Sequence, residues 1–307
     1  MVHKLQRLLV LVPVVIWGVT WPLSKAALAY SPPILLAGMR SLMAGLLLLL
    51  IAIPKKKKLQ FRKYWGIYLV SGIFNSVLFY GLQIIGLQYM ASGLFTVIVY
   101  LQPIFIGLIA WLWIKEPMTP AKVVGLLLGF MGVAVVSVGG VSGHISIMGV
   151  VLGILTALSW AIGTVYIKKE GYMVDGVWLI TCQSMIGGTI MTTFGSYFEK
   201  SSDIVWGTPY ILSMIFLSVF SVAIAWIVYA YLLKKGEASR VASFNFLVPV
   251  IAIVIGTLLL DEPFNYSVFV GLAFVIVSII LVNYQGPYQK KKRLITPGRS
   301  ESDDHPV

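Results

Sequence analysis

The stretch Ala91–Pro117, ASGLFTVIVYLQPIFIGLIAWLWIKEP, is written a second time in altered form at Ala238–Pro263, ASRVASFNFLVPVIAIVIGTLLLDEP. Both copies begin with Ala-Ser, carry one proline inside an apolar run, and end on Glu-Pro. The inner proline is Pro103 in one copy and Pro249 in the other, and each precedes its glutamate by 13 residues. The chain therefore carries an internal duplication, and its two halves are predicted to share one fold.

The composition places this duplication in a membrane. Of 307 residues, 59% are hydrophobic and 11% are charged, whereas soluble domains average roughly 45–50% apolar and about 25% charged residues. Continuous apolar runs recur along the chain at the ~20-residue length that a helix needs to cross a bilayer. Because these runs do not alternate apolar with polar residues, they indicate helices rather than a barrel. An all-α polytopic membrane protein is predicted.

The apolar runs give ten candidate spans: 8–29, 33–53, 65–86, 92–114, 121–140, 148–168, 176–197, 209–233, 240–260 and 266–284. If the N-terminus is placed in the cytoplasm, all but three of the 23 Lys and Arg residues fall on the cytoplasmic side, as the positive-inside rule requires. The exceptions are Lys25, Arg40 and Lys200. We therefore expect ten transmembrane helices in the cytoplasmic membrane, with both termini cytoplasmic.

The odd number of spans in each half gives the duplication its meaning. The predicted units are residues 1–147, with spans one to five, and residues 148–284, with spans six to ten; residues 285–307 are predicted to form a disordered cytoplasmic tail. Five spans per half invert the second copy, so Glu116 is expected at the cytoplasmic rim and Glu262 at the outer rim. Inverted repeats of this kind build transporters, because two opposed halves can open one cavity to either side in turn. Earlier positions also match at an offset of 143 residues: Trp17 with Trp160, Lys25 with Lys168, and Arg40 with Gln183.

In this arrangement the chain resembles the EamA-type members of the drug/metabolite transporter superfamily. The residues that carry the resemblance are the WGVTWPLSK run at 17–25, Arg40, the LQP run at 101–103, and the Glu-Pro pairs at 116–117 and 262–263. The resemblance covers about residues 8–284. It implies a ten-span carrier for small metabolites, often amino acids or related compounds, that commonly works outward. It does not fix a substrate.

The first span concentrates residues that could line a substrate cavity. Pro22 removes a backbone donor and is expected to kink the helix. Trp17 and Trp21 share a face at helical spacing, with Thr20 between them and Ser24 on the same face as Trp21. The alternative for the indoles is an interfacial anchor, but Trp17 lies near the middle of its span, which favours the cavity.

Arg40 is the most informative single residue. It lies seven residues inside its span, about 10 Å deep at ~1.5 Å per residue. A charge in hydrocarbon costs ~2.5–3.5 kcal/mol even on the lenient insertion scale, so the guanidinium is expected to face protein or water. Two roles remain open at this stage: a substrate group, or a structural arginine satisfied by backbone carbonyls. Lys25 is nearer the surface, where it can snorkel. If both cations point inward, the outer half of the cavity suits a carboxylate.

Further polar or aromatic residues at span depth complete the set of candidate cavity residues. For each of the amides, an interhelical hydrogen bond is the alternative to a substrate contact. These candidates are Asn75, Tyr100, Gln102, Trp160, Thr164, Gln183 and Asn245. Pro103 and Pro249 are predicted to kink equivalent helices in the two halves.

Two pairs of glycines, Gly125 with Gly129 and Gly149 with Gly153, allow helices to approach closely. Packing within the bundle is the simpler interpretation, and a homodimer contact is the alternative.

Catalytic and metal chemistry have little support. The three histidines lie in termini or a loop, the single cysteine lies in an apolar run, and no acid falls within a span. We therefore expect no enzyme activity, no cofactor, no metal and no nucleic-acid partner. The expected partners are a small-molecule substrate and the lipid bilayer. Coupling to protons, if present, would have to use the rim acids Glu116 and Glu262 or the substrate itself. The competing functions are a scaffold or sensor without transport and, with less support, a membrane-embedded enzyme.

Overall fold

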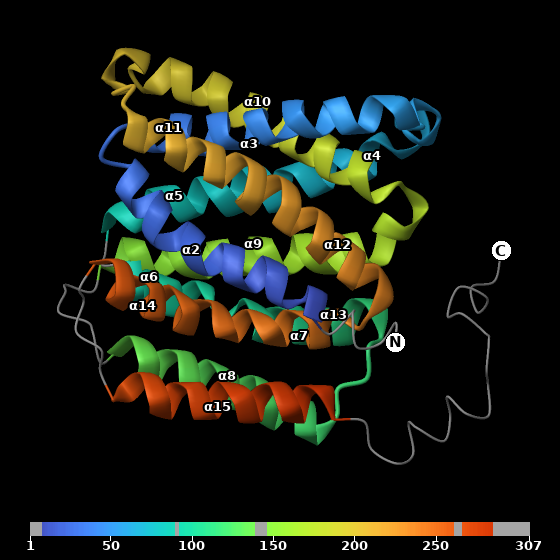
Figure 1. Cartoon of the computed structure of the whole chain (residues 1–307). Helices are drawn as coiled ribbons and strands as arrows, with labels where there is room; N and C mark the ends of the chain where they lie inside the picture. The colour runs from blue at the N-terminus through green and yellow to red at the C-terminus, as the bar shows by residue number, and fades with distance from the viewer. Residues whose placement is uncertain (1–7, 90–91, 139–145, 261–265, 285–307) are drawn as a thin grey trace.

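The computed structural model describes residues 8–89, 92–138, 146–260 and 266–284, and within these ranges every regular element is helical (Figure 1). Glu262 and the tail after residue 284 lie outside the described residues. The prediction of an all-helical membrane protein is confirmed.

The helices of the first half begin with α2. In chain order they are α2 (Leu11–Ala27), α3 (Pro33–Ala52), the 3-10 turn η1 (Ile53–Lys58), α4 (Phe61–Gly72), the π-helix η2 (Ile73–Leu78), α5 (Phe79–Tyr89), α6 (Ser92–Val99), α7 (Gln102–Ile114) and α8 (Pro120–Val138).

The second half begins with α9, an α-helix of 24 residues. Its elements are α9 (Ile147–Glu170), η3 (Gly171–Met173), α10 (Gly176–Phe198), η4 (Ser201–Asp203), α11 (Thr208–Ile215), the π-helix η5 (Phe216–Ile224), α12 (Ala225–Lys235), α13 (Ala238–Ser243), η6 (Phe244–Phe246), α14 (Leu247–Leu260) and α15 (Ser267–Asn283).

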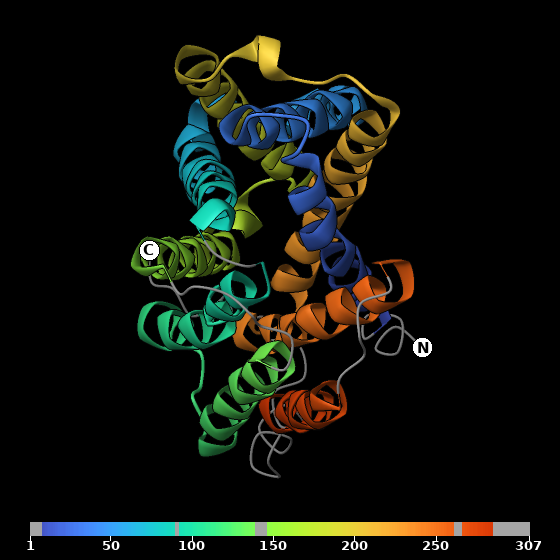
Figure 2. The same ribbon diagram turned by 90° about the vertical axis from the view of Figure 1, so that its left-hand side faces the viewer.

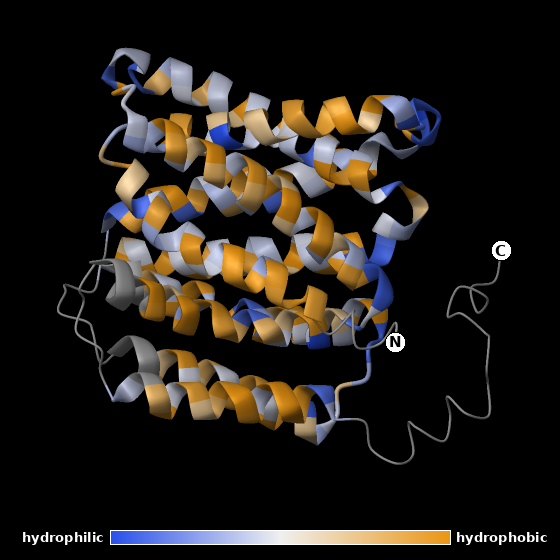
Figure 3. Cartoon of the chain, in the orientation of Figure 1, coloured by the Kyte–Doolittle hydropathy of each residue, from blue (hydrophilic) through white to orange (hydrophobic). Residues whose placement is uncertain are grey.

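Several of these elements join end to end into continuous helical segments. Six described segments are long and apolar enough to cross a bilayer: Pro33–Lys58, Phe61–Tyr89, Phe95–Ile114, Ile147–Met173, Gly176–Phe198 and Thr208–Lys235. Four shorter apolar helices accompany them: Leu11–Ala27, Pro120–Val135, Ala238–Ala252 and Phe269–Asn283. Apolar residues dominate the helix lengths and hydrophilic ones gather at their ends (Figure 3).

The three prolines interrupt helices in different ways. Pro22 lies inside α2, whereas Pro103 occupies the first turn of α7, just after the break that separates α6 from α7. Pro249 lies near the start of α14, just after the 3-10 turn η6. Pro103 and Pro249 therefore each follow a break in the helix. The π-helices η2 and η5 were not predicted, since wide turns leave no simple composition signal.

Two helix pairs pack most closely, α3 with α10 and α8 with α15. A side-chain carbon on Gly45 would lie 2.8 Å from the backbone nitrogen of Met185, and one on Gly188 would lie 2.4 Å from that of Leu42. Glycine at both positions lets the α3 and α10 backbones approach. Viewed at right angles, α8 and α15 again lie side by side at one edge of the bundle (Figure 2).

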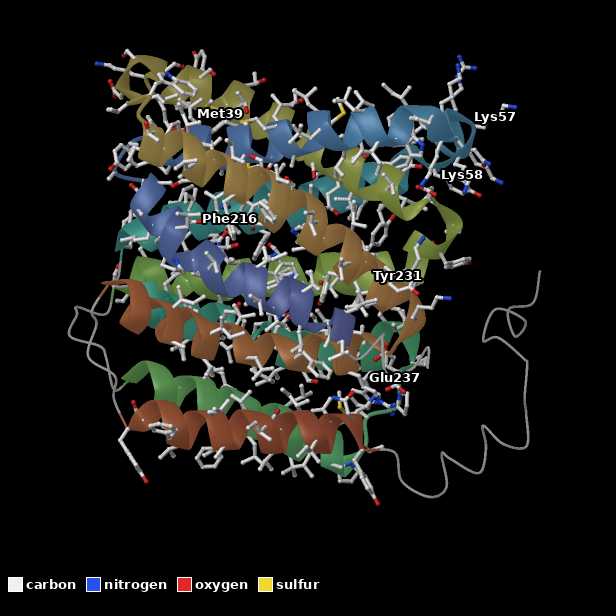
Figure 4. The ribbon with its side chains drawn as sticks, in the orientation of Figure 1. Met39, Lys57, Lys58, Phe216, Tyr231 and Glu237 are labelled. Carbon is white, nitrogen blue, oxygen red and sulfur yellow. The ribbon has the colours of Figure 1, made fainter. Side chains whose placement is uncertain are left out.

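The two ends of the bundle differ in charge. Lys57, Lys58 and Glu237 lie at one end (Figure 4), which we call the basic end. At the opposite end, Glu199 caps α3 by accepting hydrogen bonds from the backbone N–H groups of Ile34 and Leu35, at 2.9 and 2.8 Å. The carboxylate offsets the free N–H groups and positive dipole of that helix start.

Candidate functional site: an aromatic cavity with a buried arginine

Aromatic rings from helices of both halves meet in the interior. Trp17 of α2 contacts Trp160 of α9, with 5.2 Å between ring centroids, and Tyr229 of α12, also at 5.2 Å. Trp226 lies 5.9 Å from Trp17 and 6.5 Å from Trp160. Most of these contacts are edge-on, the geometry that ring quadrupoles favour. We call Trp17, Trp160, Trp226 and Tyr229 the aromatic cluster.

Hydrogen bonds fix most of the neighbouring rings. The indole of Trp226 donates to the Tyr80 hydroxyl at 2.7 Å, and that of Trp21 donates to the Tyr100 hydroxyl at 3.2 Å. Trp17 donates to the Ser221 carbonyl of η5 at 3.3 Å. The indole nitrogen of Trp160 is buried and has no hydrogen-bond partner in the described part of the chain.

A narrow cavity lies beside this cluster. Its lining comes from α2, α5, α9 and η5 and consists of Trp17, Thr20, Trp21, Phe79, Tyr80, Gln83, Trp160 and Ser221. The lining is mostly aromatic with a few convergent polar groups, as in many small-molecule sites. The cavity volume is about 10 Å³, room for about one water molecule, so the surrounding helices must move apart before a metabolite can enter. The structure thus gathers four of the candidate cavity residues, Trp17, Thr20, Trp21 and Trp160, around one space.

Arg40 lies directly behind this lining. It is fully buried, and its Nη1 donates to the Ser24 hydroxyl at 3.1 Å while its Nη2 donates to Oε1 of Gln83 at 3.2 Å. Its guanidinium carbon stands 4.3 Å from the centroid of the Tyr80 ring, a cation–π contact. Among the described residues it forms no ion pair. A full positive charge is therefore held next to the cavity by neutral groups alone.

Gln183 lies as far from the start of α10 as Arg40 lies from the start of α3. The start of α10 is at the basic end. The Oε1 of Gln183 accepts a hydrogen bond from the Ser71 hydroxyl at 2.9 Å, and the Asn75 amide reaches the same hydroxyl at 3.5 Å. Asn75 belongs to the π-helix η2 and also lies against Gly163 of α9. Gln183, Ser71 and Asn75 are all uncharged, whereas the matching position of α3 holds the cation Arg40.

The remaining candidates are buried outside the cavity lining. Thr164, Asn245 and Gln102 each expose 1% of their surface or less, and each has a buried polar atom without a partner in the described chain. Tyr100 is fully buried against Trp21 and Trp160.

Glu116 is placed at the basic end, where it links the two halves. Its Oε1 accepts from the backbone N–H of Ala238 at 2.6 Å, and its Oε2 accepts from the Ser239 hydroxyl at 2.9 Å and the Ser239 N–H at 3.3 Å. Beside it, the buried ammonium of Lys122 forms an ion pair with Glu237 and donates to the Ser239 hydroxyl. The Glu-Pro end of one copy thus caps the Ala-Ser start of the other. The equivalent Glu262 lies outside the described residues.

Three of the candidate glycines pack within the bundle. A side-chain carbon on Gly125 would meet Val282 of α15 at 2.8 Å, and one on Gly153 would meet Ile98 of α6 at 2.8 Å. Gly129 lies against Phe246 and Ser278.

Four cavity residues are outside the set of cavity candidates from the sequence: Phe79, Tyr80, Gln83 and Ser221, although Gln83 is one of the polar residues at span depth. Gln83 had a detectable signal, since an amide within an apolar span needs partners. Tyr80 and Phe79 had none, because aromatic residues are common throughout membrane helices.

Comparison with known proteins identifies the family of this chain. The EamA-like transporter family matches the chain twice, over residues 5–138 and 147–284. The chain belongs to the EamA-like transporter family. The uncharacterized transporter YvbV of Bacillus subtilis is 50% identical over 277 residues, which cover 90% of this chain and 91% of that protein.

A more distant relative carries an informative name. A protein of Salmonella typhimurium named a probable amino-acid metabolite efflux pump is 25% identical over 283 residues, covering 89% of this chain and 93% of the relative. A solved crystal structure at 18% sequence identity matches the fold with a TM-score of 0.78, over 95% of this chain and 99% of the other. The chain is thus a multi-pass membrane protein of a transporter family.

Proposed function

We propose that this protein is a secondary carrier that moves small carboxylate-bearing metabolites, such as amino acids, out of the cell by alternating access. The observation that carries the proposal is the unneutralised guanidinium of Arg40 behind an aromatic cavity. A buried charge is costly, and the cavity next to it, once widened by the helix movements of alternating access, would give a substrate anion a place to offset that cost. The name of the Salmonella relative supports the amino-acid class and the outward direction.

Alternating access would use ten spans in two inverted halves, residues 1–147 and 148–284. The double family match and the six long plus four shorter apolar helices support this arrangement. The contacts between α3 and α10 support it as well. Adding 143 to the pair Leu42 and Gly45 gives Met185 and Gly188, and Gly45 meets Met185 while Gly188 meets Leu42. A pseudo-twofold axis that exchanges the two halves would turn each of these contacts into the other.

The basic end is proposed to face the cytoplasm, with both termini and the tail on that side, because Lys and Arg are retained there. Cysteine labelling in intact cells tests this. The 54–64 loop should be protected from an impermeant thiol reagent, and the 141–147 loop should react with it. Labelling of both loops from the same side would contradict the inverted arrangement.

The function is tested by transport in proteoliposomes. Purified protein should accelerate the movement of at least one member of a mixture of the twenty radiolabelled amino acids, compared with protein-free vesicles. Binding without movement would favour a sensor, and chemical conversion of the solute would favour a membrane enzyme. A homodimer remains a prediction, which sizing in detergent would test.

A further inference from the structure

Resting on the proposed function, we infer that Gln83 is the residue that touches the substrate carboxylate, and that Arg40 acts on the substrate through Gln83. Gln83 lines the cavity, whereas Arg40 lies behind it and is fully buried. The substrate-facing donor is then an amide N–H backed by a guanidinium.

The bond between the two side chains fixes which way the amide points. A guanidinium has donors and no acceptor, so Gln83 must present its oxygen to Arg40. The observed contact joins Arg40 Nη2 to Gln83 Oε1 at 3.2 Å. The amide nitrogen of Gln83, with two hydrogens, is therefore the group left to face the cavity. Because hydrogen bonds in series polarise one another, the guanidinium makes this nitrogen a better donor.

The other polar groups around the cavity leave mainly donors for a ligand. The Thr20 hydroxyl donates to the Ile16 carbonyl at 2.8 Å and leaves only an acceptor, and the indoles of Trp17 and Trp21 already have acceptors. The Tyr80 hydroxyl accepts from Trp226 and so keeps its own hydrogen, and the buried Ser221 hydroxyl has no partner among the described residues. The buried indole N–H of Trp160, which also lines the cavity, has no acceptor among the described residues. Gln83 and Trp160 thus supply N–H donors from opposite halves. A carboxylate accepts hydrogen bonds and donates none, so it matches this donor set.

The other half lacks a counterpart of the Arg40–Gln83 pair. At the 143-residue offset, Arg40 corresponds to Gln183 and Gln83 corresponds to Trp226. Neither replacement supplies an amide backed by a cation. The inference therefore places carboxylate recognition in the half of the cavity away from the basic end.

The experiment compares variants of the full-length protein in proteoliposomes, with the mixture of twenty radiolabelled amino acids as the probe and KM then measured for each amino acid carried. Gln83→Leu removes the donor and should raise KM about tenfold or more, the value of a hydrogen bond to a charged group. Gln83→Glu keeps a partner for Arg40 but places a carboxylate at the cavity wall, so it should abolish uptake of the amino acids that the wild-type protein carries, because their own carboxylates would meet a like charge. Gln88→Glu is the matched control, since Gln88 is exposed on the same helix and should leave KM unchanged.

A double substitution separates Gln83 from Arg40. Arg40→Gln should raise KM in the wild-type background. In the Gln83→Leu background it should raise KM little further, because the side chain through which Arg40 acts on the substrate is already gone. An equal further loss in that background would overturn the inference, since Arg40 would then contact the substrate independently. Wild-type KM in a folded Gln83→Leu variant would overturn it too, while leaving the carrier proposal standing. If the wild-type protein carries none of the twenty amino acids, the carboxylate proposal falls and the Gln83 assignment with it.

Discussion

Two buried cations, Arg40 and Lys122, differ in whether an ion pair neutralises their charge. Lys122, 1% exposed, pairs with the carboxylate of Glu237 and donates to the Pro117 carbonyl at 2.9 Å. Arg40, 0% exposed, has a hydroxyl, an amide oxygen and an aromatic ring around it. The first cation is neutralised at the basic end, where the two halves meet. The second keeps its net charge beside the cavity.

The difference separates architecture from recognition. A buried ion pair repays part of its desolvation by mutual attraction, and removal of one partner leaves a costly charge. Neutral hydrogen bonds stabilise a buried guanidinium but leave its field available to a ligand. Lys122 is therefore expected to matter for folding, and Arg40 for the affinity of an anionic substrate. The following predictions test that division.

The largest effect is expected for Lys122→Met. It removes the ammonium that contacts Glu237, the Pro117 carbonyl and the Ser239 hydroxyl, and should destabilise the protein by about 3 kcal/mol, although Glu237 keeps its ion pair with Arg240 at 3.1 Å. The measurement is the thermal melting midpoint in detergent, with Lys169→Met as the control, because Lys169 is 41% exposed and pairs with Glu170 at 3.7 Å. Equal melting midpoints for the two variants would contradict a structural role for Lys122.

Glu116→Gln should have the next largest effect on stability. The neutral amide keeps one acceptor oxygen for the N–H groups of Ala238 and Ser239 but loses the charge, at a cost of about 1.5–3 kcal/mol. The melting midpoint should fall while the substrate KM stays close to wild type. A changed KM at unchanged stability would place Glu116 in recognition or coupling instead.

Much of this fold could be predicted from the sequence, and less of the site. Apolar run lengths and the repeated Ala-Ser and Glu-Pro ends indicate membrane helices and a duplicated plan, because burial in lipid leaves a strong composition signal. Depth along a span is also readable, so Arg40 was placed correctly as a buried charge. The rotation of each helix is not readable, so the partner Gln83 and the ring of Tyr80 could not be assigned.

At the basic end, too, side-chain partners could not be predicted from the sequence. The sequence alone predicts Lys122 only as a cytoplasmic charge, since a lysine near a span end usually reaches water. Its burial depends on Glu237, 115 residues further along the chain. Contacts at such separation follow from the packing of the two halves, which a single sequence does not encode in local patterns.

A smaller effect is expected for Trp226→Phe. The substitution removes the indole donor to the Tyr80 hydroxyl and should lower stability by about 1 kcal/mol. Because Tyr80 supports the guanidinium of Arg40, we also expect a modest rise in KM. Trp206→Phe serves as the control, since Trp206 is 63% exposed. An unchanged melting midpoint and KM in Trp226→Phe would show that this hydrogen bond does not order the site.

The smallest effect is expected for Lys25→Met. Lys25 is exposed and donates to the Leu87 carbonyl at 2.9 Å, so its charge is screened by solvent rather than focused on the cavity. Stability should stay within about 0.5 kcal/mol of wild type, and KM should not change. A rise in KM as large as that of an Arg40 variant would place Lys25 in the anion site.

The central claim is that the unneutralised charge of Arg40 selects a carboxylate. The most direct measurement is KM for an amino acid that the wild-type protein carries and for its carboxamide, which has a neutral amide in place of the carboxylate, in wild type and in Arg40→Gln. The substitution copies the residue at the matching position of the other half. We predict that KM for the amino acid rises about tenfold, the equivalent of ~1.4 kcal/mol, whereas KM for the amide is unchanged. Equal KM values for the amino acid in the two proteins, both folded and equally expressed, would contradict the claim and leave Arg40 as a structural residue.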